Sequence, residues 1–198
     1  MCILVGDWGE LTSVRHEESM VSSDYSSVLV GRSLLYFMSD DGCILEYDFA
    51  RHDLTVFDPP NYESIYDGRY NIMLAEDGGL GVAEAIDFQL ILWKREASDG
   101  TDARWVLSRV MDLPNLLPTS ARLDESNRVL VVGFAEGANV IFVTTVAGVF
   151  MIKLQSNEVR KVCDDHGFRN LIPVVSFYTP HARLKALVGE HPMTHRHG

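Results

Sequence analysis

Short apolar runs separated by turn-forming residues recur three times along this chain. The three repeats cover Val28–Asp58, Leu80–Val110 and Val129–Val162. Each contains runs rich in β-branched and aromatic residues, which is the composition of β-strands. Units of about 40–50 residues with several strands each are typical of propeller blades. We therefore predict an all-β fold made of kelch- or WD-like antiparallel β-propeller blades.

The alternation of side chains and the turn residues predict eight strands, each pairing antiparallel with its neighbour in sequence. Asp41-Gly42 and Asp99-Gly100 predict type I′ hairpin turns, which need a positive φ at both central residues. Asp58–Tyr70 and Pro114–Asn127 are predicted to connect blades, and Arg95–Ala103 is a polar excursion between strands. The predicted strands are Leu34–Met38, Cys43–Phe49, Leu54–Phe57, Phe88–Lys94, Trp105–Val110, Val129–Phe134, Val140–Thr144 and Gly148–Leu154.

Some of these strands are apolar on both faces, as in Phe88–Trp93 and Val149–Ile152. A strand buried on both faces lies between two other layers, as a blade lies between its neighbours. Truncation of one such side chain, Leu92→Ala, is expected to cost about 2–5 kcal/mol. The side chains predicted to be largely buried are Leu45, Tyr47, Leu90, Leu92, Phe142, Phe150 and Ile152.

Composition favours a reducing compartment and gives no membrane span. Of the 198 residues, 46% are hydrophobic, yet no apolar run reaches the roughly 18 residues that cross a bilayer. The apolar start Met1–Gly6 is too short for a signal-peptide core. The cysteines Cys2, Cys43 and Cys163 are odd in number and widely spaced, which argues against a disulfide framework or a zinc site. We expect an intracellular protein, in the cytoplasm, the nucleus or both.

The net charge of −11 bears on partners. It disfavours nonspecific attraction to nucleic acid or to an anionic membrane, so we expect neither as a partner. The simplest interpretation of the acidity is a solvated surface that keeps the protein soluble.

No combination of residues predicts a catalytic, cofactor or metal site, so we predict no enzyme and no cofactor. His16-Glu17-Glu18 lacks the second histidine of a zinc-protease motif. Asp164-Asp165-His166 precedes Gly167, which is typical of a turn, and Gly78-Gly79-Leu80-Gly81 opens no helix that would bind phosphate. The last residues fit a disordered tail whose histidines occur by chance, with binding of a stray metal ion as the alternative. These histidines are His181, His191, His195 and His197.

The aromatic residues divide into two groups. Trp93 and Trp105 lie inside predicted strands, which favours packing in the core or between blades. The others lie in or beside connections, where turn packing is the first interpretation. They are also the better candidates for any aromatic contact with a partner, although the partner-binding residues themselves stay unassigned. This second group comprises Trp8, Tyr62, Tyr66 and Tyr70.

Several longer sequence segments are more specific than the general strand-and-turn pattern of propeller blades. Together they resemble the C-terminal β-propeller region of the large plant F-box protein family, particularly its grass members. The resemblance covers about residues 8 to 180. These segments are Val28–Phe37 followed by Gly42–Asp48, Ala75–Gly81 leading to Leu90–Arg95, and Gly133–Phe142 followed by Gly148–Met151 and Ser176–Pro180.

The resemblance implies the role of a substrate receptor. In this family an N-terminal F-box docks on the Skp1 adaptor of a cullin-based ubiquitin ligase, while the propeller holds a protein target. The present sequence shows no F-box. Met111–Leu117 superficially resembles the opening of one, but it lies between two β repeats, and Pro114 and Pro118 interrupt any helix there. Skp1 is therefore not an expected partner of this chain.

The expected organisation is a propeller region over residues 1–180 and a disordered tail over 181–198. The propeller region supplies about three to four blades, the first of them truncated, so we expect an incomplete, open propeller that self-associates through exposed edges. The expected function is a protein-interaction module for target recognition. The alternative is a stand-alone or decayed fragment without a ubiquitin-ligase role, and a propeller enzyme or lectin is the third class.

Overall fold

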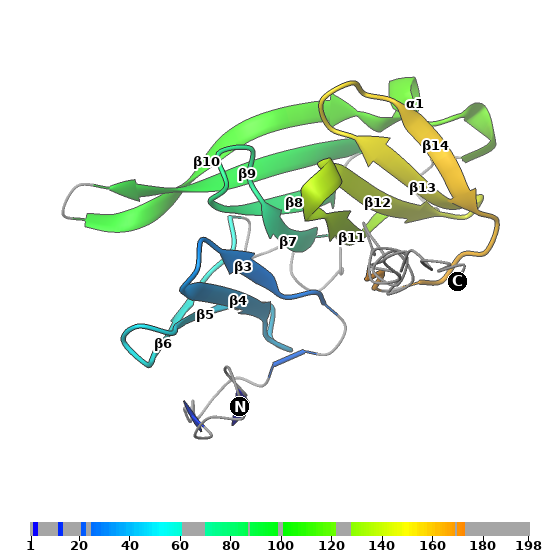
Figure 1. Cartoon of the computed structure of the whole chain (residues 1–198). Coiled ribbons are helices and arrows are strands. Elements are labelled where there is room, and N and C mark those ends of the chain that lie inside the picture. The colour runs from blue at the N-terminus through cyan, green and yellow to red at the C-terminus, as the bar shows by residue number, and fades with distance from the viewer. Residues whose placement is uncertain are drawn as a thin grey trace, which may run out of the picture.

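The computed structural model describes residues 2–3, 12–13, 21–22, 25–60, 70–86, 88–98, 101–121, 128–168 and 170–172. The regular structure of these residues is almost wholly antiparallel strand, with turns and connections between the strands (Figure 1). Three four-stranded sheets, here called blades 1 to 3, follow a two-stranded sheet of β1 (Cys2–Ile3) and β2 (Thr12–Ser13). Blade 1 comprises β3 (Val28–Val30), β4 (Leu34–Met38), β5 (Ile44–Asp48) and β6 (Asp53–Phe57). Blade 2 comprises β7 (Tyr70–Leu74), β8 (Leu80–Ile86), β9 (Gln89–Ser98) and β10 (Thr101–Asp112). Blade 3 comprises β11 (Leu130–Ala135), β12 (Val140–Thr145), β13 (Gly148–Lys153) and β14 (Val159–Cys163).

Each blade is a meander in which every strand pairs with the next strand of the sequence. The first strands lie together, because β7 packs against β3 and β4 on one side and against β11 on the other. The last strands, β6, β10 and β14, form the outer edges of the sheets. First strands around a common axis and last strands at the periphery are the arrangement of propeller blades. Among the described residues no sheet closes onto itself, so the predicted all-β, incomplete propeller is confirmed.

All eight predicted strands are present, and each pairs with its neighbour in sequence. The eight do not include β3, β8 and β14, which begin inside the three predicted repeats. Two other segments were predicted wrongly. No strand was predicted over Tyr70–Leu74, yet β7 occupies it and is the first strand of blade 2. Arg95–Ala103 was predicted as an excursion, but Glu96 pairs with Arg104 and Ser98 pairs with Thr101.

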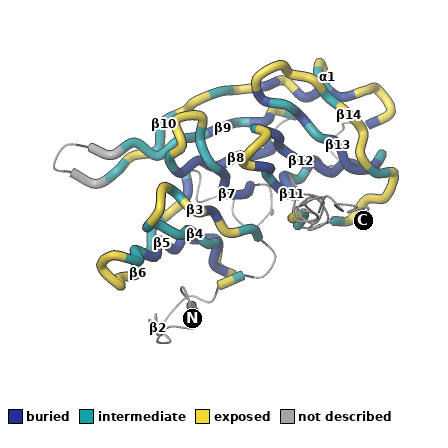
Figure 2. The backbone as a smooth tube through the Cα atoms, in the orientation of Figure 1, coloured by how far each residue is buried: buried dark blue, intermediate teal, exposed yellow. Residues whose placement is uncertain are grey.

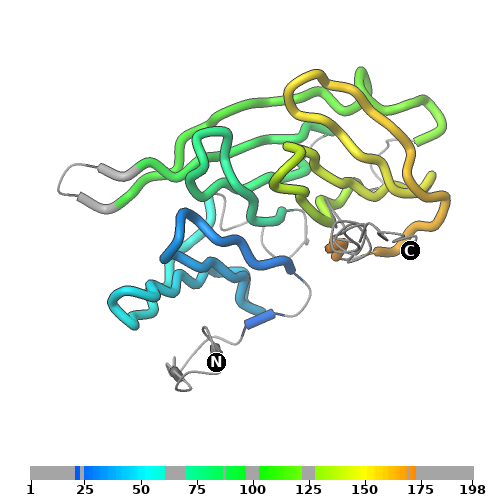
Figure 3. The backbone as a smooth tube through the Cα atoms, viewed as in Figure 1, coloured from blue at the N-terminus to red at the C-terminus, as the bar shows by residue number. Residues whose placement is uncertain are grey.

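The paired excursion makes the β9–β10 hairpin an arm that projects beyond the body of the molecule (Figure 3). Charged side chains line it, since the Lys94 ammonium lies 2.7 Å from a Glu96 carboxylate oxygen and Arg104 lies 3.8 Å from the other. The Lys94 ammonium lowers the pKa of Glu96 by hydrogen bonding and by its charge. The arm is formed by strands because its backbone pairs, although its sequence is polar.

The turn at Asp41-Gly42 is not the predicted type I′. Gly42 has a φ of 85°, but the φ of Asp41 is not positive. The Gly42 amide donates to the Ser39 carbonyl oxygen at 3.0 Å, and the Ser39 amide donates to that of Cys43 at 2.9 Å. This is the pattern of a type I turn closed by glycine in the left-handed region. Asp99-Gly100 lies outside the described residues.

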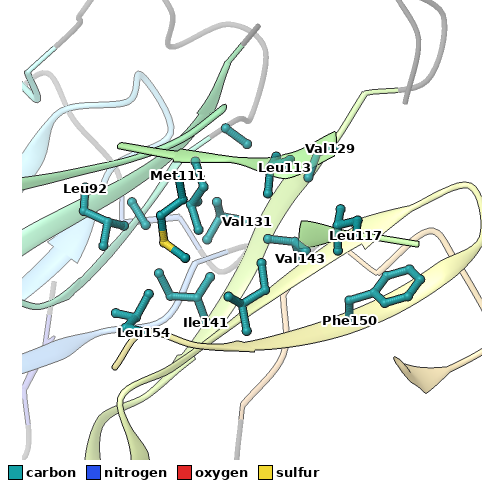
Figure 4. Packing of buried hydrophobic residues seen from close by; sticks show 14 of the residues in the cluster. Leu92, Met111, Leu113, Leu117, Val129, Val131, Ile141, Val143, Phe150 and Leu154 are labelled. Atoms are coloured by element: carbon teal, nitrogen blue, oxygen red, sulfur yellow. The ribbon is translucent and has the colours of Figure 1, made fainter. Parts of the chain in front are cut away.

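The core lies between the blades (Figure 2). One buried cluster joins blades 1 and 2, and a larger one joins blades 2 and 3. Figure 4 shows the larger cluster, in which Leu92 and Met111 of blade 2 face Ile141 and Leu154 of blade 3. The predicted burial is confirmed for Leu45, Tyr47, Leu90, Leu92, Phe150 and Ile152.

Phe142 is the exception, because it is only partly buried. Its neighbours Ile141 and Val143 both belong to the cluster between blades 2 and 3. Successive side chains of a strand point to opposite faces, so Phe142 lies on the face of blade 3 that points away from blade 2. The prediction was wrong because no further described blade covers that face.

The segment Met111–Leu117 combines the end of β10 with a single helical turn, α1 (Leu113–Leu116). Pro114 lies in the first turn of this helix, where its missing amide costs nothing. Leu113 and Leu117 are buried in the cluster between blades 2 and 3. The prediction of no helix here thus holds except for this one turn, which packs on the core. No described helix is long and apolar enough to span a membrane.

Candidate functional site

Polar residues singled out in the sequence lie in turns. The Lys161 ammonium is 2.5 Å from an Asp164 carboxylate oxygen and lowers the pKa of Asp164 by hydrogen bonding and by its charge. The His166 amide donates to the Asp165 carboxylate at 2.9 Å. The described residues contain no group of three His, Cys, Asp or Glu that would hold a metal ion. His16-Glu17-Glu18 and the histidines of the tail lie outside the described residues.

The glycine-rich segment forms the β7–β8 turn, as predicted. The Gly78 amide donates to the Ala75 carbonyl oxygen at 2.9 Å, and Gly78 has a φ of 81°. A Cβ atom on Gly81 would lie 3.0 Å from the carbonyl oxygen of Trp93 on the neighbouring strand. The segment therefore joins two strands at close approach and does not form a phosphate-binding loop.

Trp93 and Trp105 pack against the buried cluster that blades 1 and 2 share, as predicted. The Trp105 indole N–H of blade 2 donates to the Asp58 carbonyl oxygen at the end of blade 1, at 2.9 Å. The Trp93 indole donates to the Glu84 carboxylate at 3.3 Å. Tyr70 is 3% exposed and its hydroxyl donates to the Gly42 carbonyl oxygen, so it serves turn packing and offers no surface to a partner. Trp8, Tyr62 and Tyr66 lie outside the described residues.

Phe57 is the centre of the contact between blades 1 and 2. Its ring lies 6.4 Å from that of Trp105, and the Arg95 guanidinium carbon lies 3.2 Å above its centroid. Such a cation–π contact stabilises by about 0.5–2 kcal/mol. Tyr36 packs edge-on against the same ring. Burial, and then the hydrogen bond with Glu46, raise the pKa of Tyr36.

A second arginine ties blade 2 to blade 3. The Arg109 guanidinium donates to the Leu154 carbonyl oxygen and, at 2.7 Å, to the Asn157 side-chain oxygen. Sequence patterning missed both this contact and the one at Arg95, because each partner comes from another blade. The two arginines thus join blade 2 to both of its neighbours.

One end of the strands is here called the connection rim. It carries the β4–β5, β8–β9 and β12–β13 turns and the segments that leave β6, β10 and β14. Hydrogen bonds join these parts, since Tyr70 binds Gly42 and the Leu113 amide donates to the Phe88 carbonyl oxygen at 2.9 Å. The rim carries exposed carboxylates from all three blades, while its basic side chains among the described residues are Arg128 and Lys161. These carboxylates are Asp40, Asp41, Asp58, Asp112, Asp164 and Asp165.

The opposite end, here called the hairpin rim, is closer to neutral. Three of its carboxylates lie beside cations in ion pairs. Clustered carboxylates give a surface a negative potential that attracts basic partners. Within the described part of the chain, the acidity expected only to solvate the protein is therefore greatest on the connection rim, which is the candidate interaction surface. The three pairs are Asp48–Arg51 at 3.6 Å, Asp77–Lys94 at 3.8 Å and Glu158–Lys153 at 2.6 Å.

Asn71 on β7 is a buried polar residue without a visible partner. It is 1% exposed, and neither its amide nitrogen nor its amide oxygen has a hydrogen-bond partner among the described residues. The hydroxyl of Thr144, which is 5% exposed, likewise has no hydrogen-bond partner among the described residues. A buried polar group left unpaired costs about 1–3 kcal/mol.

We expect Asn71→Leu to raise the free energy of unfolding by about 1–3 kcal/mol, because it removes that penalty at nearly constant volume. Chemical denaturation followed by tryptophan fluorescence measures the change. Thr144→Val is the matched variant on blade 3 and is expected to act in the same direction. A loss of stability at Asn71 would mean that its amide is bound, for example to an ordered water.

The comparisons with known proteins agree with this architecture. A family model described as "F-box protein AT5G49610-like, beta-propeller" matches residues 3–181. No curated protein matches the chain. The matched span contains all three blades, whose strand order is that of propeller meanders. The chain therefore belongs to the family of F-box protein AT5G49610-like β-propellers.

Proposed function

We propose that this propeller is a protein-interaction module that recognises targets, in the manner of the target-binding part of an F-box subunit of a cullin-based ubiquitin ligase. The observation that carries the proposal is the family match over residues 3–181, which spans three blades that share buried apolar clusters. We infer further that the module works inside the cell and performs no chemistry of its own.

The connection rim is the proposed target-binding surface. It gathers turns from all three blades, and loops on a rigid scaffold commonly carry recognition. Its exposed carboxylates suit a target segment rich in Lys and Arg, whose association would weaken as salt screens the charges. The target class is therefore a protein with a basic surface segment.

The test compares two variants that each remove three negative charges. The rim variant carries Asp40→Asn, Asp58→Asn and Asp165→Asn, and the control carries Asp53→Asn, Glu76→Gln and Glu136→Gln on the hairpin rim. Immobilised chains capture proteins from an extract, and each purified candidate is then titrated against all three forms. A true target is expected to lose at least about tenfold in affinity for the rim variant only, since several rim charges act together. Equal losses for both variants would contradict this surface.

Skp1 is not expected to bind this chain. The segment with a superficial likeness to an F-box opening, Met111–Leu117, lies on the core, and Leu113 and Leu117 are 0% and 5% exposed. Exposing them to an adaptor would open the contact between blades 2 and 3. A pull-down with purified Skp1 measures this, and robust one-to-one binding would force that segment to be reconsidered as a docking element.

The same assays separate the ligase role from a stand-alone role. A chain that holds a target without Skp1 is expected to shield that target, so its overexpression should lengthen the target's half-life in cells. The rim variant should not do so. A shortened half-life would instead indicate that the chain delivers the target to a ligase through another contact.

A further inference from the structure

Residues 170–172, which follow blade 3, reach across to blade 1. The Ser26 hydroxyl, two residues before β3, donates to the Asn170 side-chain oxygen at 3.0 Å, although the two residues are 144 positions apart in sequence. The Leu171 amide donates to the Val132 carbonyl oxygen on β11 at 2.6 Å. One short segment thus contacts the first strand of blade 3 and the entry to the first strand of blade 1.

These two contacts complete a circuit around the axis. Blade 1 meets blade 2 where β3 packs on β7, and blade 2 meets blade 3 where β11 packs on β7. Residues 170–172 then lead from β11 back to the start of β3. The sheets themselves stay separate, so the circuit is closed at the first strands and not by pairing of whole blades.

Gly133 on β11 makes room for this segment. A Cβ atom at Gly133 would lie 2.6 Å from the Leu171 carbonyl oxygen, and its next two neighbours also belong to Leu171. A β-bulge between Val131 and Gly133 interrupts the regular pairing of β11 with β12 at the same place. The adjacent Val132 is fully buried. The inner strand of blade 3 is therefore shaped to accept Leu171 at close range.

We propose that residues 170–172 are a clasp that holds blade 1 and blade 3 together at the axis. Its role is conformational: it fixes the end blades, and with them the turns of the connection rim, in one arrangement. Because the Leu171 hydrogen bond joins the segment to its own blade, the link to blade 1 is the Ser26–Asn170 hydrogen bond, which favours the closed form by roughly twofold to tenfold over an open one. A clasp of that strength holds blades 1 and 3 together beside their first strands, while their sheets stay separate.

A cysteine pair tests the contact directly. In a background with Cys2→Ser, Cys43→Ala and Cys163→Ser, the pair Ser26→Cys and Asn170→Cys is expected to form a disulfide in native buffer. The bond would close a large loop, so it changes mobility on a non-reducing gel. The control pair, Ser26→Cys with Gln155→Cys, places the second cysteine in the exposed β13–β14 turn on the hairpin rim and should stay reduced. Equal oxidation of both pairs would contradict the proposed clasp. So would a result in which the first pair oxidises in denaturant but not in native buffer.

Hydrogen exchange on the unsubstituted chain gives a second test that does not depend on the folding of a variant. The Leu171 amide is expected to exchange at least about tenfold more slowly than an unstructured amide. Gly133→Ala should abolish that protection while the β12–β13 amides stay protected. Gly79→Ala is the matched control, because its Cβ would meet only the Asp77 carboxylate, at 3.2 Å. Unprotected exchange at Leu171 in the unsubstituted chain would refute the proposal, whatever the cysteine pair does.

Discussion

Gly148→Ala is expected to lower the free energy of unfolding by about 3–5 kcal/mol, which is a large part of the total stability of an ordinary domain. Gly148 begins β13 with a φ of 119°, which an L side chain rarely adopts. A Cβ there would lie 2.2 Å from the Cys163 carbonyl oxygen and 3.1 Å from the Asp164 Cα. These are backbone atoms, so relief requires separating β13 from β14.

Gly31→Ala is the matched control for this prediction. Gly31 also has a positive φ, 62°, but a Cβ there meets no atom within 4 Å. Its replacement should lower the free energy of unfolding by about 1–2 kcal/mol, which is the cost of placing an L residue in the left-handed backbone conformation. Urea denaturation of both variants, followed by tryptophan fluorescence, gives the two losses. Equal losses would mean that the close approach of β13 to β14 at Gly148 relaxes at little cost.

The repeat in the sequence sufficed to predict the blades because most of their strands carry β-branched and aromatic runs bounded by turns. The sequence pattern did not predict the strand β7, for a physical reason. Tyr70, Asn71, Ile72 and Met73 are all buried, so the strand shows no alternation, and an amide stands in its middle. A strand between two blades is held by tertiary packing that local patterning does not record.

The β9–β10 arm was missed for the opposite reason. Its outer part is polar, and polarity normally indicates a loop, yet Glu96 pairs with Arg104 on a two-stranded ribbon. One ion pair across the ribbon, Arg104–Glu96, and one along β9, Lys94–Glu96, lie there in place of apolar contacts. Backbone pairing and cross-strand charges determine how far this hairpin extends.

The candidate interaction surface was harder to predict from the sequence than the fold. Asp40 and Asp165 lie in different blades, and only the parallel placement of the blades brings their turns to one rim. The contact of Arg95 with Phe57 likewise depends on how blade 1 meets blade 2. Tyr70 stood beside a predicted connection, which made it a candidate for a partner, but it points inward to Gly42. Spacing along a chain does not reveal such encounters between repeats.

Leu92→Ala is expected to cost about 2–5 kcal/mol, as large-to-small changes in well-packed cores do. Leu92 is 4% exposed on β9 and belongs to the cluster that blades 2 and 3 share. The lost contacts therefore weaken the interface between two blades as well as the packing of one sheet. Leu107→Ala on the neighbouring β10 is the control, because Leu107 is 51% exposed and should cost less than about 1 kcal/mol.

The shape of the transition carries as much information as its midpoint. Because the core lies between the blades, loss of Leu92 should move one cooperative transition to lower denaturant and leave its slope unchanged, since the surface exposed on unfolding stays the same. Two separate transitions would indicate that blades 2 and 3 unfold independently and that their shared cluster contributes little. A loss near that of the Leu107 control would indicate that the strand β9 is exposed in solution. Either outcome would contradict a propeller whose blades are stabilised by one another.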